Sequence, residues 1–444
     1  MKTSKLLKNT IAVLFVLYCF YSYGLQPFFT WETFWDGKLG YIGEVSFRTI
    51  IGLLIIIVSL IVFVRRNQKF NKQDFTLAVW CLATTGIGIL FSGFEHFFSL
   101  EWIIFLVFFC FMLSSDELKA KSYYLFYNIF VIALIVPIIV YILVHIGIHV
   151  PYTEIKAFEQ MKTNQWIYYK IYPLASQWAS PYQETYCALR LCGIYNESGV
   201  VGTYAALLLC IEKFKLKDNW KNVVLLIGGI LSFSLAFYLI VFIYFTIKAA
   251  KLNTKYLFLI ISVVCLYFVF MNVSFENEAL TRLQARFTIT SYGLQGNNRT
   301  SESYDQLFNS FIAEGGTNLL FGYGHGEIEK VMEERLINGS SYKNLIYNYG
   351  IVGFFNQILW MLAFPFIYRR KTHNNSSLFY ALTCVSVFIA SFYQRPAMFA
   401  LQYMLPLVGG VVYHTMTINQ NSSEKKMRGV LSASNKIRIS TTRR

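Results

Sequence analysis

The sequence predicts an all-α polytopic membrane protein with about 12 transmembrane helices and two large external loops. Three observations lead to this fold class. The chain of 444 residues is 55% hydrophobic and only 14% charged, with a mean hydropathy of +0.46, whereas a soluble domain carries about a quarter charged residues. Apolar runs of roughly 17–25 residues, the length that crosses a bilayer, alternate with short charged connectors. Lysine and arginine gather in every second connector, as the positive-inside bias requires.

The apolar runs can be followed along the whole chain. A basic leader, residues 1–10, precedes the first run, and no small-residue cleavage site follows it, so we expect a retained first helix rather than a signal peptide. The expected spans lie at 10–27, 47–64, 74–92, 99–115, 122–148, 198–213, 222–234, 235–250, 255–271, 345–368, 376–392 and 397–416. The basic connectors are 65–72, 119–121, 213–221, 248–255 and 369–371. This alternation places both chain ends in the cytoplasm.

The spans and loops divide the chain into six segments. Residues 1–148 hold the first five spans, 198–271 the next four and 344–416 the last three. Two polar interruptions, 149–197 and 272–343, separate them and fall on the same external face. Residues 417–444 form a basic polar tail, which we expect to be disordered in the cytoplasm.

The stretch 223–247 has two interpretations. It is either one long helix or a tight pair of helices around Ser232 to Ser234. A single span would invert the second loop and remove the charge bias of the later connectors. We therefore expect the pair.

Composition also bounds the function. The net charge of +15 is concentrated in connectors and tails, which argues against a nucleic-acid partner and fits membrane lipids instead. Ionisable residues are scarce in the spans, which disfavours an ion-coupled carrier. The six histidines show no metal-binding spacing, so we expect no metal and no cofactor. No nucleotide loop, serine nucleophile elbow or Asp-x-Asp pair is present, which points to a lipid-linked donor.

The first external loop ends in a polar motif that leads directly into a span, Arg190-Leu-Cys-Gly-Ile-Tyr-Asn-Glu-Ser-Gly199. Arg190 is suited to a bidentate grip on a phosphate, or else anchors to lipid headgroups. Glu197 lies where it can cap the helix or act as a general base. Gly199 and Gly202 leave a small-residue stripe on the helix.

The second external loop predicts a small folded segment. Apolar residues recur at helical spacing from Tyr304 to Ile312 and from Ile328 to Leu336, which predicts two amphipathic helices. Gly315-Gly316 and Asn338-Gly339 should end them. A glycine-rich turn, 320–326, lies between. The cations form an early group of Arg282, Arg286 and Arg299 and a late group of Lys330, Arg335 and Lys343, and acidic residues outnumber them. Single arginines among acidic residues fit recognition of one pyrophosphate better than binding of a polyanion, whereas Lys330 and Arg335 are better explained by salt bridges within a helix.

The pattern resembles the bacterial O-antigen polymerases, the lipid-linked repeat-unit polymerases that are related to O-antigen ligases. Topology extends the resemblance over most of the chain. The motif from Arg190 to Gly199 is similar to the family's Arg-x-x-Gly-x-aromatic-x-Glu-Pro-Gly signature, with Glu197-Ser198 in place of Glu-Pro. Arg299, the helix that follows it, and Leu320-Phe-Gly-Tyr-Gly324 are like the family's arginine, amphipathic helix and Gly-x-Gly segment. Gly350-Ile-Val-Gly353 resembles the next motif, and Lys343-Asn344 replaces the His-Asn often found in ligases.

The resemblance implies a metal- and nucleotide-independent glycosyltransferase of the bacterial inner membrane. It would join undecaprenyl-pyrophosphate-linked oligosaccharide repeat units into O-antigen or capsular polysaccharide at the periplasmic face. Arg190 and Arg299 would contact pyrophosphate and Glu197 would be the base. Arg282 and Arg286 would assist, and Tyr323, His325 and Asn344 would line the sugar-binding cleft.

Partners and alternatives follow from the same resemblance. The expected partners are the lipid-linked oligosaccharide and membrane lipids, with a chain-length regulator protein as a candidate. An O-antigen ligase, which transfers glycan to lipid A core, is the alternative within enzymes. A lipid-linked oligosaccharide flippase is the alternative from another class, although a flippase should show repeated halves and polar central spans.

Overall fold

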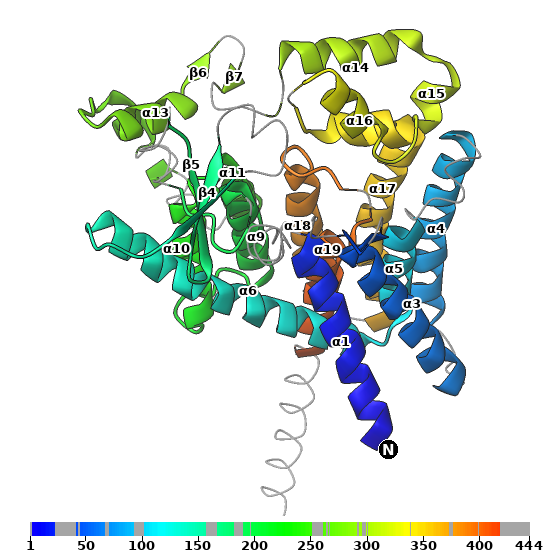
Figure 1. Ribbon diagram of the computed structural model, residues 1–444. Coiled ribbons are helices and arrows are strands. Elements are labelled where there is room, and N and C mark those ends of the chain that lie inside the picture. The colour runs from blue at the N-terminus through cyan, green and yellow to red at the C-terminus, as the bar shows by residue number, and fades with distance from the viewer. Residues whose placement is uncertain are drawn as a thin grey trace, which may run out of the picture.

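The protein is mostly helical in the computed structural model (Figure 1). The structure describes residues 2–22, 41–42, 45–66, 71–92, 102–156, 167–181, 190–195, 197–250, 261–262, 265, 267–290, 293–294, 299, 301–337, 339–372, 376–397 and 399–417. The expected cytoplasmic tail beyond residue 417 and most of the expected span at 255–271 lie outside these ranges. The all-α prediction is therefore confirmed at the level of fold class, with small antiparallel sheets added.

Five helices form the N-terminal part of the bundle. They are α1 (Lys2–Ser22), α3 (Phe47–Arg66), α4 (Lys72–Ser92), α5 (Trp102–Leu113) and α6 (Asp116–His145). The Ser115 hydroxyl accepts a hydrogen bond from the Leu118 N–H and so caps α6. Asp116 and Glu117 follow in its first turn, where carboxylates favour a helix start. A two-stranded ribbon, β1 (Tyr41–Ile42) and β2 (Val45–Ser46), precedes α3.

The first loop folds into strands that the sequence did not predict. β3 (Thr153–Lys156), β4 (Tyr168–Tyr172) and β5 (Ala175–Ala179) form an antiparallel sheet in the order β3-β4-β5. Pro173 and Leu174, the latter at φ 56°, make the tight turn between β4 and β5. The Ser176 N–H donates to the Gly193 carbonyl at 2.6 Å, which fixes the chain just after Arg190 to this sheet.

The stretch 223–247 is a pair of helices, as expected. α9 (Ser198–Ile211) is followed by α10 (Trp220–Leu231) and α11 (Leu235–Ala249). Phe233 lies in the break at φ 44°. A Cβ added to Gly202 would come within 3.0 Å of the Ser232 and Ser234 side chains, so the small residue lets α9 approach this turn closely.

The second loop contains helices that pack on the start of a long helix. α13 (Glu278–Arg286) and the ribbon of β6 (Ile289–Thr290) and β7 (Gly293–Leu294) come first. α14 (Glu302–Glu314), α15 (Gly316–Phe321) and α16 (Glu327–Glu334) follow, and α17 runs from Tyr342 to Thr372. Gly315 ends α14 at φ 64°, as predicted, whereas α16 ends at Glu334, before Asn338-Gly339. In Figure 1, α14–α16 gather at the end of α17 that lies opposite the N-terminus of the chain.

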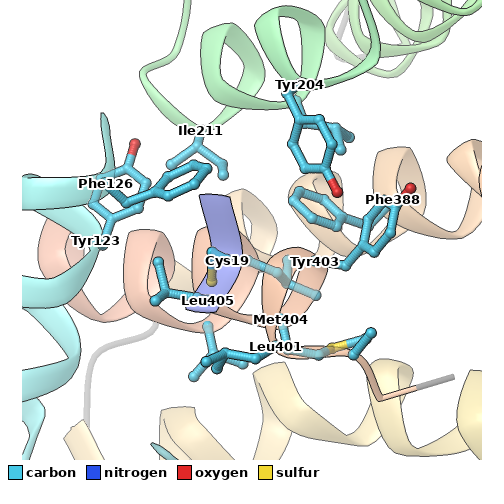
Figure 2. Packing of buried hydrophobic residues seen from close by; sticks show 14 of the residues in the cluster. Cys19, Tyr123, Phe126, Tyr204, Ile211, Phe388, Leu401, Tyr403, Met404 and Leu405 are labelled. Carbon is cyan, nitrogen blue, oxygen red and sulfur yellow. The ribbon is translucent and has the colours of Figure 1, made fainter. Parts of the chain in front are cut away.

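The C-terminal elements occupy the centre of the core. α18 (Ser376–Ser391) precedes α19 (Leu401–Met404), which continues into the π-helical turn η3 (Leu405–Gly409). Tyr403, Met404 and Leu405 are buried, and Figure 2 shows them among side chains of α1, α6, α9 and α18. α9 is buried over its whole length, and the segment at 399–412 packs in the same cluster.

The apolar helices differ in whether they are long enough to cross a membrane. Two of the described helices, Asp116–His145 and Tyr342–Arg370, are long and apolar enough to span a bilayer. Other apolar helices are shorter, such as α10 with 12 residues. At about 1.5 Å per residue, such a helix covers roughly 18 Å of a hydrocarbon core about 30 Å thick. Among the described residues, two of the expected spans are therefore identified, and the full number of about 12 stays a prediction.

Candidate functional site: arginines at the start of α9

Glu197 marks the centre of the candidate site. It precedes α9 with an extended backbone (φ −148°, ψ 140°), and its side chain makes no capping hydrogen bond. Its Oε2 instead accepts from Nη2 of Arg395 at 2.5 Å, and each side chain is 22% exposed. The capping interpretation of Glu197 is therefore wrong, because its carboxylate is committed to an ion pair with the far end of the chain.

Arg299 converges on the same place. A Cβ added to Gly199, in the first turn of α9, would lie 3.1 Å from Arg395 Nη2, 3.7 Å from Arg299 Nη2 and 3.7 Å from Glu197 Oε2. Two guanidinium groups and one carboxylate therefore border one glycine. With the Gln394 amide oriented so that its oxygen faces Arg299, Nε of Arg299 donates to it at 2.8 Å. A side chain at Gly199 would crowd Arg395, whereas Arg299 and Glu197 would lie at ordinary contact distance.

Arg190 comes to the site from the first loop. Its Nε lies 3.4 Å from the carbonyl oxygen of Ser232, and the next residue, Leu191, donates its N–H to the Leu231 carbonyl at 2.9 Å. Arg190 also borders a small hollow on α6, lined by Pro137 and Val140 among others. The turn between α10 and α11 therefore holds Arg190 on one side, and the sheet holds it on the other.

The electrostatics show that positive charge dominates the cluster. Burial, together with the Arg395 charge, lowers the pKa of Arg299 to about 10, and Arg190 adds to this effect. Burial is the largest effect on Arg395 and lowers its pKa, but the Glu197 carboxylate, with Tyr403 and Tyr204, raises it, and the net pKa of Arg395 is raised. Glu197 thus compensates Arg395 more than Arg299. An anion placed between the arginines would gain from both.

Arg395 is the residue of this cluster that the sequence did not single out. It lies in the short connector between the expected spans at 376–392 and 397–416, which the charge alternation puts on the external face. An arginine in an external connector is an exception to the positive-inside bias. This exception is the feature of the sequence that could have pointed to Arg395. The pairing itself spans 198 positions in the sequence, so no local motif contains it.

The second-loop residues form a separate polar network on α14–α17. Asn344 is buried, accepts from the Tyr304 hydroxyl at 2.5 Å and donates to Oε1 of Glu329 at 2.9 Å. Tyr304 also hydrogen-bonds the Ser341 hydroxyl at 3.1 Å, and the neighbouring Ser340 N–H donates to the Arg299 carbonyl at 2.9 Å. This chain of contacts holds the backbone of Arg299.

Tyr323 and His325 lie in the glycine-rich turn of the same region. The Tyr323 hydroxyl donates to the Glu314 carboxylate, and its ring packs on Tyr347. Nδ1 of His325 contacts the Tyr349 hydroxyl. Burial lowers the pKa of His325, which keeps its imidazole neutral at neutral pH. The cleft role of these residues and of Asn344 stays a prediction.

Arg282 and Arg286 are placed only by their backbone. Both belong to α13, and their side chains lie outside the described part of the structure. Figure 1 shows α13 across the molecule from α14–α16. Their assisting role therefore stays a prediction, while Arg190, Glu197 and Arg299 are brought together.

Two lysines of the second loop form ordinary ion pairs. Lys330 pairs with Glu327 at 2.6 Å within α16, as expected, and Lys343 pairs with Asp305 at 2.7 Å. Within the described ranges, no group of three or more His, Cys, Asp or Glu side chains is arranged to hold a metal ion.

Comparisons with known proteins do not extend this description. The chain matches no protein-family model, no curated protein and no solved structure. Arg299, Arg395 and Glu197 at a helix N-terminus, with Arg190 close enough to lower the pKa of Arg299, are suited to binding a compact, multiply charged anion.

Proposed function

We propose that this protein is a glycosyltransferase that polymerises undecaprenyl-pyrophosphate-linked oligosaccharide repeat units. The observation that supports the proposal best is the convergence of Arg299 and Arg395 on Gly199, with Arg190 close enough to influence the pKa of Arg299. Guanidinium groups grip phosphate oxygens bidentately, and a helix N-terminus adds a partial positive charge. The resemblance of the sequence motifs to O-antigen polymerases also implies a pyrophosphate-linked substrate.

The reaction requires stabilisation of a leaving group. The bond between the anomeric carbon of the growing chain and its pyrophosphate oxygen breaks, and the electron pair leaves on that oxygen. The hydroxyl oxygen of the incoming repeat unit forms the new bond to the anomeric carbon and loses its proton to a base. Arginines fixed before the reaction would stabilise the charge that develops on the pyrophosphate.

Glu197 is the proposed base. Its carboxylate lies at the arginines and so close to the bond that would break. A carboxylate held by an arginine is a weak base, because the cation favours its charged form. Glu197 would therefore accept the hydroxyl proton only when its pair with Arg395 has opened.

The proposed setting is the bacterial inner membrane, with about 12 spans and both ends in the cytoplasm. The two long apolar helices, the basic connectors and the external position expected for residues 149–197, 272–343 and 395 support it. The amphipathic helices α14 and α16 would then lie at the periplasmic surface. The membrane lipids would hold the undecaprenyl chain beside the site.

The ligase and flippase alternatives remain distinguishable by experiment. The gene would be deleted in its host, and the surface polysaccharide would be resolved by size on a gel. Single-repeat products support the polymerase, loss of all attached repeats supports the ligase, and a normal ladder rejects both. A flippase deletion would also trap lipid-linked repeats on the cytoplasmic face, where they resist an external glycosidase.

Complementation then tests the site. We expect Arg299→Ala to leave single repeats, because one side of the pyrophosphate site is lost. Lys330→Ala is the matched control, since Lys330 is a cation of the same loop that pairs with Glu327 within α16. Full-length polymer with Arg299→Ala and with Arg190→Ala would reject the arginine roles.

A further inference from the structure

The Glu197–Arg395 pair is unusual for a helix start. Glu197 occupies the cap position of the 14-residue helix α9, yet its carboxylate makes no capping hydrogen bond. It contacts Arg395 instead, which lies between α18 and α19. A side chain that caps a helix stabilises its first turn. The competing contact must therefore be the more favourable one, because the carboxylate has moved to the arginines.

The arginine keeps donor capacity beyond this pair. Only Nη2 of Arg395 contacts Glu197 in the described hydrogen bonds, and its Nε is buried without a hydrogen-bond partner. A buried donor without an acceptor is unfavourable. A carboxylate offers two oxygens, whereas a pyrophosphate offers many more around two tetrahedral centres. A pyrophosphate could therefore satisfy donors that Glu197 leaves unused.

The position and exposure of Glu197 and Arg395 would allow a pyrophosphate to replace the Glu197 carboxylate. Glu197 Oε2, Arg395 Nη2 and Arg299 Nη2 all face the same space at Gly199, within 3.7 Å of a Cβ built there. The two paired side chains are each 22% exposed, so the pair is reachable without opening the core. An anion that entered between the two arginines would meet the Glu197 carboxylate directly and would be repelled by it.

We propose that Glu197 is an internal counter-anion of the pyrophosphate site, which holds Arg395 through its carboxylate and is displaced when a pyrophosphate binds. This rests on the proposed function and deepens it. It assigns Arg395 as a third pyrophosphate-binding arginine. It also couples binding to chemistry, because the displaced carboxylate loses its arginine partner and becomes a better base only with the donor in place.

The test separates binding from turnover. Binding of inorganic pyrophosphate to the full chain in nanodiscs would be measured by calorimetry, for the wild type, Glu197→Gln and Arg395→Gln. Glu197→Gln should bind about tenfold more tightly, which equals about 1.4 kcal/mol, because the competing charge is gone. It should nevertheless polymerise poorly in cells. Arg395→Gln should bind more weakly than the wild type.

A matched control tests whether the change in net charge alone alters pyrophosphate binding. Glu327→Gln makes the same change in net charge in α16, where Glu327 pairs with Lys330, and should leave pyrophosphate binding unchanged. If Glu197→Gln does not fold, Glu197→Asp keeps the charge but withdraws the carboxylate by one methylene, and should also tighten binding.

The outcomes distinguish the two proposals. Equal or weaker pyrophosphate binding by Glu197→Gln and Glu197→Asp overturns the counter-anion role alone. Tighter pyrophosphate binding by Glu327→Gln as well would show that the change in net charge alone explains the result, and would also overturn the counter-anion role of Glu197. No pyrophosphate binding by the wild type or any variant would instead reject the pyrophosphate site on which the proposed function stands.

Discussion

Gly322 and Gly350 interlock the second loop with the long helix α17. A Cβ on Gly322 would lie less than 3.0 Å from the carbonyl oxygen of Asn348, and a Cβ on Gly350 less than 3.0 Å from that of Leu320. The two adjoining N–H groups, of Tyr323 and Gly324, donate to the Tyr347 and Asn348 carbonyls at 3.0 and 2.9 Å. Gly350 also breaks α17 at φ 68° and ψ 177°. Two glycine motifs far apart in the sequence thus form one backbone contact.

Gly322→Ala should destabilise the protein strongly, because the new methyl group meets backbone that cannot move aside. Gly315→Ala is the matched control: Gly315 also has positive φ (64°, against 80° for Gly322), but nothing lies within 4 Å of its Cβ position. We expect a cost of about 1–3 kcal/mol at Gly315 from the backbone alone and a clearly larger cost at Gly322. Thermal unfolding in detergent measures both. Equal costs would show that the close approach is not needed.

Asp74→Asn should be destabilising by about 3–5 kcal/mol, because it leaves a buried cation without its nearest carboxylate. Nζ of Lys119 lies 3.1 Å from Asp74 and 3.8 Å from Asp116, and the Lys119 side chain is 1% exposed. The double variant Asp74→Leu with Lys119→Met should recover most of the loss, since both charges are removed together. Denaturant unfolding of the three proteins checks this, and no recovery in the double variant would contradict the ion-pair explanation.

Tyr304→Phe should lower both stability and activity. The hydroxyl is shared by Asn344 and Ser341 in a buried site, and its loss should cost about 1–3 kcal/mol. Because Ser340 holds the Arg299 carbonyl, pyrophosphate binding should weaken as well. Ser310→Ala is the control, since the Ser310 hydroxyl bonds only the Leu307 carbonyl of its own helix among the described hydrogen bonds. Unchanged pyrophosphate affinity in Tyr304→Phe would show that the hydrogen bonds of Tyr304 do not influence binding by the arginines.

Stability should fall as the pH drops below the ordinary pKa of histidine. Burial lowers the pKa of His325 below 6.5, against a smaller opposing effect of Glu329. The unfolded chain therefore binds a proton near 6.5 that the folded chain accepts only at lower pH. Stability from this group is complete above 6.5 and is lost as the pH falls toward the lowered value. Comparing thermal midpoints at about pH 8 and about pH 5, His325→Gln should show a smaller decrease than the wild type, and an equal decrease would exclude His325 as the source.

Periodicity and charge predicted the local elements well. The apolar repeats from Tyr304 and from Ile328 are helices, and the 223–247 stretch is broken at Phe233. Both signals are local, because an amphipathic face and a helix break are encoded within one or two turns. The strands β3–β5 were not predicted, since they are short and their pairing joins segments separated by a loop.

Local sequence also pointed to Arg190, Glu197 and Arg299 as charged residues at the ends of external loops, but it could not assign their partners. Glu197 was equally suited to capping α9, and only the tertiary contact of Arg395 with the start of α9 brought this arginine to its carboxylate. The sequence by itself therefore determined a mostly helical, strongly apolar chain with arginines at loop ends, because those properties depend on composition and spacing. The tertiary structure alone decided that Arg299 and Arg395 meet one glutamate at Gly199. Such a contact depends on which helices pack together, and that choice is made by the whole core.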